Sequence, residues 1–373
     1  MAKNNLTDAR KAKSDEFYTQ YNDIQKEMEA YLECNPGVFR GKAVYCNCDD
    51  PFESNFFRYF ALNFNKLGLK RLITTSYKPS PVANTQLELF GNDKTLTKAK
   101  GRPKVTANKF VIDEVHDIDG DGEFNLKDVV MQLKANKHNE WMPLEGDGDF
   151  RSDECVDLLK RSDIVVTNPP FSLFREYAKQ LFDHDKKFVI IGNMNAITYK
   201  EIFPKIKENR MWLGPTISSG DREFQVPESY PIAAAGWRVD HEGRKFLRIK
   251  GVRWFTNLDH GRRHQPLPLM TMKEHLKYSK HKEIKGKKAY DKFDNYDAIE
   301  APFTDAIPSD YDGAMGVPIS FLDKYSPEQF EILGLAAGNI RGLAGIPSKT
   351  GKDGPYMNGK LKYGRIFIRH KRK

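Results

Sequence analysis

The sequence has 373 residues and a formal net charge of +9, with 39% hydrophobic and 12% aromatic residues. This composition excludes a disordered chain, and the length allows one large core with a second, smaller domain. The excess of Lys and Arg favours a polyanionic partner, but because 51 residues are acidic, any basic surface must be local.

The first predicted elements are a helix and a strand. Residues 1–14 are polar and lack the apolar segment of a signal peptide. The hydrophobic periodicity predicts a helix over Asp23–Leu32 and a first central strand over Lys42–Cys48, which ends in Asp49-Asp50-Pro51. An aromatic helix is expected over Asn55–Phe64.

A second strand is predicted over Leu69–Tyr77, because Gly68 ends the preceding helix. Residues 79–108 are polar and rich in Pro, Gly, Asn and Lys, which predicts a surface insertion. Inside it, Gly-Arg-Pro around Arg102 stands between lysines and resembles the core of an AT-hook, in which an Arg enters the minor groove of DNA. A solvated loop is the alternative.

An acidic loop follows a strand predicted at Phe110–His116. Its oxygen ligands have nearly the spacing of a calcium-binding loop, at Asp117, Asp119, Asp121 and Asp128. No second loop of this kind follows, and an Asp/Gly turn without metal is the alternative. We therefore assign no metal.

The β-branched run Ile164–Thr167 predicts a buried parallel strand that ends at Asn168-Pro169-Pro170-Phe171. A helix over Phe174–Phe182 and a second buried strand over Lys187–Ile191 are predicted next. Strand, helix and strand in this succession predict an α/β fold with a doubly wound, mainly parallel sheet. Such sheets bind ligands at the carboxyl ends of their strands.

The residues after this strand offer a specific chemistry. The Asn168 amide oxygen and a carbonyl in the turn that Pro169 fixes are two acceptors beside the ring of Phe171. They can accept both hydrogens of an exocyclic amine on a planar ring that stacks on Phe171, which leaves the nitrogen lone pair ready for attack. A plain turn after a strand is the alternative.

Asn-Pro-Pro-Phe after a hydrophobic strand resembles the catalytic motif of S-adenosylmethionine-dependent amino-methyltransferases. Lys13–Gln20, KSDEFYTQ, resembles their cofactor motif. Together with VYCNCDDP, GDGDFRSDE and KKFVIIGN, these segments are similar in order and content to the EcoRI modification methylase family of adenine-specific DNA methyltransferases. The resemblance implies a Rossmann-like class I fold, S-adenosyl-L-methionine as cofactor and methylation of an adenine flipped out of duplex DNA.

The resemblance also assigns residues. The catalytic set is Asn168, Pro169, Pro170 and Phe171. The cofactor contacts are Phe17, Tyr18, Thr19, Asp49, Asp50, Asp147, Gly148, Asp149 and Phe150. The alternatives are that Phe17 and Tyr18 pack the start of the helix Asp23–Leu32 against the core, and that Gly146–Asp149 is a plain turn. The sequence departs from the family pattern in two places: Phe52–Asn55 brings no glycine to the turn after the first strand, and Ser76 and Tyr77 stand where many relatives have an acid that holds the ribose.

Residues 215–373 are predicted to form a target-recognition region after a catalytic domain at 1–214. Eight lysines lie within Lys273–Lys292, hereafter the lysine stretch, a pattern that suits phosphate contacts; a solvated loop is the alternative. The candidate DNA contacts are Arg102, Trp237, Arg238, Arg262, Arg263, Lys285, Lys287 and Lys288. A short amphipathic helix is predicted over Ser326–Leu335, and a basic strand over Tyr363–His370.

We expect a cytoplasmic, monomeric DNA adenine methyltransferase that belongs to a restriction-modification system or is an orphan or phage modification enzyme. Its partner is double-stranded DNA, with no obligate protein partner and no membrane. The chain has no C-x-x-C pair for zinc and no apolar run of membrane-spanning length. The alternatives are an amino-methyltransferase that acts on RNA or on a protein glutamine, and a DNA-binding protein with an inactive methyltransferase core.

Overall fold

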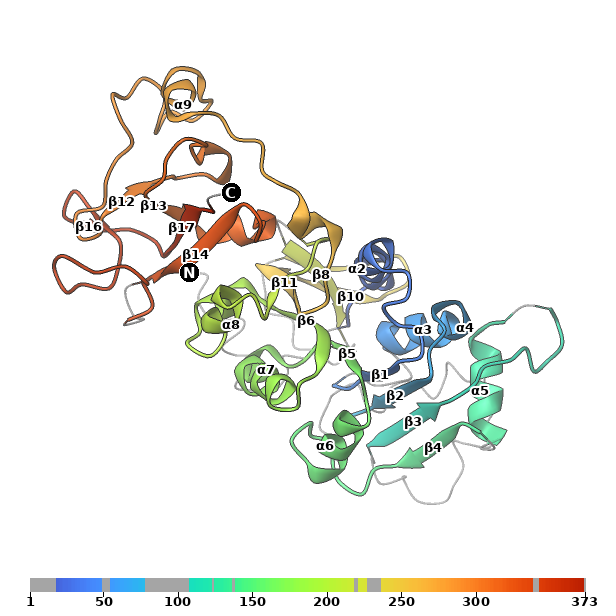
Figure 1. Cartoon of the computed structure of the whole chain (residues 1–373). Coiled ribbons are helices and arrows are strands. Elements are labelled where there is room, and N and C mark those ends of the chain that lie inside the picture. The colour runs from blue at the N-terminus through green and yellow to red at the C-terminus, as the bar shows by residue number, and fades with distance from the viewer. Residues whose placement is uncertain are drawn as a thin grey trace. The chain divides into compact units, whose positions relative to one another are not determined.

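The computed structural model describes residues 18–48, 54–77, 107–122, 124–135, 138–217, 221–226, 236–337 and 342–371. The chain forms two compact units, which Figure 1 colours by residue number. Unit 1 consists of Met1–Met194 and Ser219–Leu258, and unit 2 consists of Asn195–Ser218 and Asp259–Lys373. The sequence predicts a single domain boundary after residue 214. In the structure, the chain leaves unit 1 after Met194 and returns to it for Ser219–Leu258.

Unit 1 is built on a central sheet in which strands follow the order β4-β3-β2-β1-β5-β6-β11. They are β4 (Glu140–Pro143), β3 (Asn108–Ile112), β2 (Arg71–Thr75), β1 (Ala43–Cys46), β5 (Ile164–Thr167), β6 (Lys187–Asn193) and β11 (Val252–Thr256). The strands β2, β1, β5 and β6 are parallel, whereas β3, β4 and β11 run antiparallel to their neighbours. The predicted α/β fold with a mainly parallel sheet is confirmed.

Helices cover both faces of this sheet. They are α2 (Tyr21–Cys34), α3 (Asn55–Leu62), α4 (Phe64–Leu67), α5 (Leu126–Ala135), α6 (Asp153–Lys160) and α7 (Phe174–Asp183). The chain passes from β1 through α3 to β2 in one direction, and from β5 through α7 to β6 in the other. Because such crossovers are right-handed, α3 and α7 lie on opposite faces (Figure 1). The strand order therefore reverses between β1 and β5, at a topological switch point.

Local signals set the bounds of the first helices. The Ser54 hydroxyl caps α3 by accepting the N–H groups of Phe56 and Phe57, each at 3.2 Å. The buried Phe57 ring packs edge to face on Phe110 of β3 at a centroid distance of 5.6 Å. Gly68 ends α4 with a φ of 64°, the left-handed conformation that a glycine adopts at low cost.

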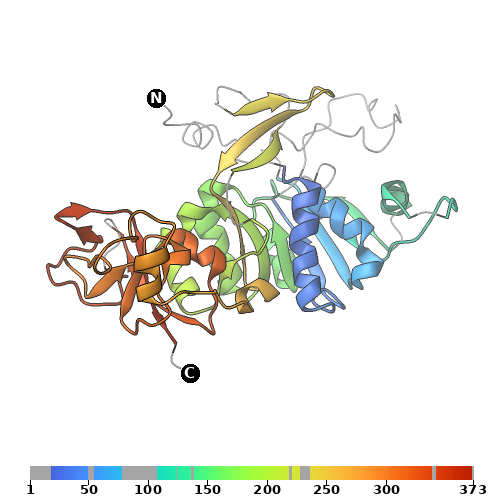
Figure 2. The ribbon, with the colours of Figure 1, turned by 90° about the horizontal axis from the view of Figure 1, so that it is seen from above.

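A three-stranded sheet, hereafter the small sheet, stands at the carboxyl edge of the central sheet. It consists of β8 (Asp221–Val226), β10 (Lys245–Lys250) and β9 (Trp237–Val239), in this order and antiparallel. β10 continues through Gly251 into β11, where Val252 pairs with Asn193 at the carboxyl end of β6. The small sheet therefore leaves the central sheet where the parallel strands end (Figure 2), and this pairing joins residues 219–258 to unit 1.

Unit 2 contains a four-stranded sheet in the order β12-β13-β17-β14. Its strands are β12 (Ala298–Glu300), β13 (Ala314–Pro318), β17 (Arg365–His370) and β14 (Phe330–Ala336). Its shorter elements include β7 (Trp212–Leu213), α8 (Phe203–Lys207), α9 (Met272–Tyr278), β15 (Tyr356–Met357), β16 (Lys360–Leu361) and the 3-10 helices η4 (Gly261–His264), η5 (Thr304–Ala306) and η6 (Ile319–Lys324). The predicted C-terminal basic strand is confirmed as β17. No helix in the described parts of either unit is long and apolar enough to cross a membrane.

The predicted helix over Ser326–Leu335 is wrong. β14 occupies most of this segment and pairs antiparallel with β17, so that Phe330 lies opposite His370. Phe330 and Ile332 are buried, whereas Glu331 between them is exposed, which is the alternation of a strand. Pairing with a strand distant in the sequence therefore overrides the local helix-start signal.

His260 gives unit 2 a stability that depends on pH. Its side chain is 3% exposed, and its Nε2 lies 3.0 Å from the Leu213 carbonyl oxygen. Burial lowers the pKa of His260 from 6.5 to about 4. A group whose folded pKa is below its unfolded value stabilises the fold fully above the unfolded pKa. This contribution is lost as the pH falls toward the folded pKa.

We expect His260→Asn to reduce the acid sensitivity of unfolding. In the unchanged protein, His260 lowers the free energy of unfolding by about 2 kcal/mol between pH 7 and pH 5. Asn keeps a donor for Leu213 but does not titrate, so the variant should lose about 2 kcal/mol less over this interval. Urea unfolding at both pH values measures the difference. Hydrogen bonds to Asp259 and Glu328 raise the pKa of His264, but His264 is present in both proteins and cancels. Equal losses would contradict the prediction.

Candidate active site

The candidate active site lies at the switch point, where β1 and β5 end. Asn47 follows β1 and Asn168 follows β5, and each is 3% exposed. The Thr167 hydroxyl donates to the Asn47 carbonyl and so joins the two strand ends. Open α/β sheets bind their ligands in the crevice at such a point, and Asn168 stands at its wall.

The four predicted catalytic residues form a tight turn at this place. Asn168, Pro169 and Pro170 are buried, and Phe171 is half-buried at the start of the 3-10 helix η2 (Phe171–Leu173). The Pro170 carbonyl accepts the N–H of Leu173 at 3.0 Å, which fixes the turn before α7 begins. The structure therefore brings all four residues together at the carboxyl end of β5.

Tyr177 of α7 connects this turn to two other segments, a role that the sequence analysis missed. Its hydroxyl donates to Asn47 Oδ1, and burial raises the pKa of Tyr177 well above its ordinary value, so the donor proton stays in place. The Tyr177 ring packs edge to face on the Phe150 ring, with a centroid distance of 5.0 Å and an interplanar angle of 72°. The Phe150 carbonyl also accepts from Gln180 of α7 at 3.0 Å. α7 therefore holds the end of β1 and the loop that carries Phe150.

The predicted cofactor loop Gly146–Phe150 packs against the end of β2. Gly148 has a φ of 80°, and a Cβ added there would lie 1.9 Å from the Ser76 carbonyl oxygen. The Ser76 N–H donates to the Asn108 carbonyl at 2.9 Å, and its hydroxyl accepts the Asn108 N–H at 2.8 Å. Ser76 thus extends the pairing of β2 and β3, and a glycine at 148 lets the loop approach this closely.

The two acids of this loop have different surroundings. Asp149 accepts from the Arg151 side chain, through Nε at 2.9 Å and Nη2 at 2.6 Å. Arg151 also donates to Glu176 of α7 at 3.0 Å. Asp147 is exposed, and its Oδ1 accepts the Asp149 N–H at 3.0 Å. Asp149 is held in an ion pair that shapes the loop, so Asp147 is the better placed of the two to accept from a ligand.

Tyr18 and Thr19 of the predicted cofactor motif lie between the small sheet and α3. The Tyr18 N–H donates to the Gln225 carbonyl of β8 at 3.1 Å. The Thr19 carbonyl accepts from the Asn55 side chain, at the start of α3, at 2.7 Å. Thr19 is 4% exposed, and among the residues that the structure describes its hydroxyl has no hydrogen-bond partner. A buried polar group of this kind suits a polar ligand.

Cys48, the last described residue after β1, has an unusual backbone conformation. This residue has a φ of 71°, in the left-handed region that favours glycine. The conformation costs roughly 1–2 kcal/mol in a residue with a Cβ. The three remaining cofactor candidates, Phe17, Asp49 and Asp50, lie outside the described residues.

Two candidate DNA contacts lie on β9 of the small sheet. Trp237 is 45% exposed. Arg238 donates through Nε to Glu223 at 2.8 Å, and its guanidinium lies 4.5 Å from the ring centroid of Phe246. Trp237 is therefore presented at the surface, whereas neighbours within the small sheet hold Arg238. Arg102 lies outside the described residues.

Arg262 and Arg263 are held by contacts within unit 2. Arg262 donates to the Pro215 carbonyl. Arg263 is 7% exposed, lies 3.6 Å from the ring centroid of Trp212, and has its Nη1 3.2 Å from Asp259 Oδ1. A contact to DNA requires an accessible guanidinium, so this placement does not support such a role for Arg263.

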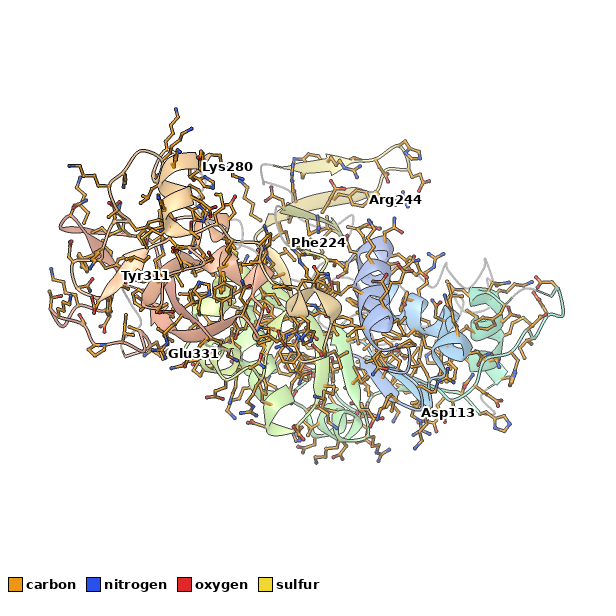
Figure 3. All side chains as sticks on the ribbon, turned by 45° about the horizontal axis from the view of Figure 1, so that its top comes forward. Asp113, Phe224, Arg244, Lys280, Tyr311 and Glu331 are labelled. Atoms are coloured by element: carbon orange, nitrogen blue, oxygen red, sulfur yellow. The ribbon has the colours of Figure 1, made fainter. Side chains whose placement is uncertain are left out.

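Lys285, Lys287 and Lys288 are exposed on unit 2. Figure 3 shows side chains of the lysine stretch projecting at the surface, with Lys280 labelled. The Lys287 Nζ lies 2.5 Å from Asp291, so part of its charge is neutralised locally. The structure thus presents all three predicted lysines to solvent, as a phosphate contact requires.

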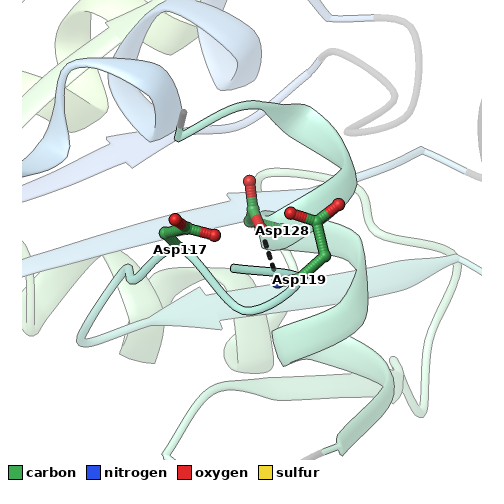
Figure 4. Close-up of side chains that lie close together, drawn as sticks. All are labelled: Asp117, Asp119 and Asp128. Atoms are coloured by element: carbon green, nitrogen blue, oxygen red, sulfur yellow. Dashed lines mark hydrogen bonds between the residues drawn. The ribbon is translucent and has the colours of Figure 1, made fainter. Parts of the chain in front are cut away.

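Three acids of the predicted calcium loop come together, with ligand atoms of Asp117, Asp119 and Asp128 within 4.8 Å of one another (Figure 4). Asp121, the fourth candidate, is not one of these three. Asp128 is buried and accepts two backbone N–H groups at 2.9 Å, and these hydrogen bonds hold its pKa below the usual range. Asp119 lies 2.6 Å from the Lys127 Nζ. These contacts favour the Asp/Gly turn over a calcium site.

Comparisons with known proteins find methyltransferases. The model of a family described as "Adenine-specific methyltransferase EcoRI" matches residues 5–371. The Type II methyltransferase M.EcoRI of Escherichia coli is 44% identical over 98% of this chain and 96% of its own. The Type II methyltransferase M.MpnI of Mycoplasma pneumoniae is 34% identical over 97% of both chains, and M.MgeORF184P of Mycoplasma genitalium is 33% identical over 97% of both. No solved structure matches this chain.

Proposed function

This chain belongs to the EcoRI family of adenine-specific DNA methyltransferases, and from that membership we propose a role for each segment at the switch point. It is an adenine methyltransferase of the Type II, restriction-modification kind. The observation that carries the assignment of the site is the buried Asn168 at the end of β5, beside the half-buried ring of Phe171.

Asn168 and the Pro169 carbonyl accept the two hydrogens of the adenine exocyclic amine. Because the two acceptors bond both amine hydrogens, they favour a pyramidal nitrogen, whose lone pair is then free to attack the methyl group. Phe171 stacks on the adenine ring, and Pro170 fixes the turn that aligns these groups. The amine of a paired and stacked adenine cannot reach a buried strand end, so the base must leave the duplex.

The residues around the strand ends fit S-adenosylmethionine, which supplies the methyl group from a sulfonium centre when bound. The buried Thr19 hydroxyl can bond a polar group of the cofactor. The exposed carboxylate of Asp147 and the buried ring of Phe150 suit an adenine ring with its amino group. The residues proposed to hold the cofactor are Phe17, Tyr18, Thr19, Asp49, Asp50, Asp147, Gly148 and Phe150. Asp149 shapes the loop through Arg151.

The proposed substrate form is duplex DNA, bound by a monomer whose residues 215–373 select the target. Two observations support this role. The exposed Trp237 lies on the small sheet, which stands at the same edge of the central sheet as Asn168. The lysine stretch of unit 2 carries exposed lysines at 285, 287 and 288.

The test is transfer of a tritiated methyl group from S-adenosylmethionine to DNA, RNA and protein in parallel. The expected result is label in duplex DNA that appears as N6-methyladenine after digestion to nucleosides. Label in RNA or in protein glutamine instead would support the other amino-methyltransferases. No label, together with no saturable heat on titration with the cofactor, would identify an inactive core.

A salt titration tests the lysine stretch. Lys285→Gln with Lys288→Gln should weaken binding to cognate and unrelated duplexes equally, because phosphate contacts carry no sequence information. The slope of log affinity against log salt should become shallower by roughly 0.9 for each lost contact. Lys66→Gln with Lys70→Gln is the control, since these exposed lysines precede β2 at the amino end of its strand, whereas Asn168 lies at the carboxyl end of β5. An unchanged slope in the first variant would exclude the phosphate contacts.

A further inference from the structure

Unit 2 contains a pocket that the proposed active site does not use. Its volume is about 360 Å³, within the range of pockets that bind small organic groups. The second half of the lysine stretch forms one side, and Glu300 of β12 and Arg365 of β17 contribute to another. The pocket therefore opens beside the lysines that are proposed to contact DNA phosphates.

The lining combines charged side chains with apolar ones and includes a fixed aromatic ring. Three of its buried side chains are apolar or aromatic: Ile284, Tyr290 and Met357. Phe303 also lines it, and the Phe303 ring stacks on His281 at a centroid distance of 3.8 Å and an interplanar angle of 10°. The His281 Nε2 lies 2.8 Å from Asp305, which holds the stacked pair in place. Phe303 thus provides a rigid, half-buried aromatic wall, the kind of surface on which nucleobases stack.

A buried ion pair faces the same space. Glu300 is 6% exposed, and its carboxylate accepts from Arg365 through Nε at 2.9 Å and Nη2 at 2.7 Å. The other charged lining residues are Glu283, Lys287, Asp291 and Lys362. Acids and bases therefore balance, and the pocket has no surplus positive charge to attract a free anion. Arg365 Nη1 also donates to the Tyr363 and Gly364 carbonyls, so the ion pair leaves little bonding capacity for a charged ligand. A neutral ring matches the pocket better, because Glu300 Oε2, which accepts only from Arg365 Nε at 3.1 Å, can still accept from an amine, and the second Nη2 hydrogen of Arg365 can donate to a ring nitrogen or carbonyl.

We propose that this pocket binds a nucleobase of DNA that has left the base stack, and that this base carries an exocyclic amine. The inference rests on the proposed function, because it takes DNA as the bound polymer. The lysines beside the pocket hold the phosphates on either side of the extruded base. Cytosine has the required amine and ring acceptors, whereas thymine lacks the amine.

The experiment compares the affinity of the full chain for three duplexes of one sequence: fully paired, with one bulged cytosine, and with one bulged thymine. The bulged cytosine should be preferred, and Phe303→Ala should lower that preference about tenfold, because base stacking is lost. Phe303→Leu keeps apolar volume without an aromatic face and should give the same result if the alanine variant folds poorly. Tyr278→Ala is the matched control, since this 61% exposed aromatic lies in the lysine stretch outside the pocket.

Asn168→Ala separates this pocket from the active site. If the bulged cytosine occupies the pocket in unit 2, the preference survives in Asn168→Ala and is lost in the Phe303 variants. Equal affinity of the unchanged chain for all three duplexes, while it still methylates adenine, would overturn the inference. A preference that is lost only in Asn168→Ala would overturn it as well. Free deoxycytidine that bound without DNA as tightly as the bulged duplex would show that the pocket serves a free nucleoside instead. No methylation and no DNA binding would mean that the proposed function itself fails.

Discussion

Asn168→Ala is expected to lower the turnover number by about a hundredfold or more while the affinity for duplex DNA stays unchanged. The magnitude is that of removing one fixed hydrogen-bonding group that acts on the transition state. The side chain is buried after the end of β5, so it exposes little surface with which to contact phosphates. Asn168 therefore stabilises the transition state at the reacting amine and does not contribute to DNA affinity.

Single-turnover methylation and a DNA-binding isotherm measure the two quantities separately. Asn168→Asp is the matched control, because it keeps an oxygen acceptor of the same reach and should retain more activity than the alanine variant. A fall in DNA affinity by the same factor as in rate would contradict the assignment, and would show that Asn168 holds the fold or the DNA rather than the amine.

Gly148→Ala is expected to abolish or strongly weaken cofactor binding, with an increase in the dissociation constant of about tenfold or more. The left-handed φ of 80° costs an alanine roughly 1–2 kcal/mol. The added Cβ would also lie 1.9 Å from the Ser76 carbonyl oxygen, and backbone atoms cannot rotate away as a side chain would. The loop must therefore move off the end of β2, and Asp147 and Phe150 move with it.

Calorimetric titration with S-adenosylmethionine measures this loss, and a thermal melt reports whether the fold survives. Gly146→Ala is an unusually close control, because it lies in the same loop with open space around its Cβ and no left-handed φ. It should bind cofactor normally. Equal weakening in both variants would mean that the loop tolerates no change at all. Normal binding by Gly148→Ala would place the cofactor away from the loop.

The catalytic strand and its neighbours could be predicted from the sequence because their signals are local. The run Ile164–Thr167 is β-branched and stopped by two prolines, and it forms β5 with the same bounds. The helix predicted over Phe174–Phe182 is α7, one residue longer. Buried strands bounded by turn residues, and helices with one apolar face, are encoded within ten or so neighbouring positions.

The contacts that connect these elements were not predictable in this way. Tyr177 and Asn47 are 130 residues apart, and although Asn47 lies in the segment VYCNCDDP, no local signal pairs it with Tyr177. Arg263 belongs to a basic segment that looks suited to DNA, yet it stacks on Trp212 inside unit 2. The wrong helix at Ser326–Leu335 has the same origin, since its strand character depends on pairing with β17. Such contacts follow from the topology of the chain rather than from local composition.

The discontinuity of unit 1 has a consequence for synthesis and for truncation. β11 pairs with β6 along its length, but residues 195–218 of unit 2 are made between the two strands. A nascent chain that has emerged only to Met194 exposes the β6 edge, with the apolar run Phe188–Ile191, to any other strand nearby. β11 covers that edge once the chain has emerged from the ribosome as far as Thr256. We therefore expect a soluble catalytic fragment to require the chain as far as Leu258, and a fragment that ends after β6 to aggregate through its open edge.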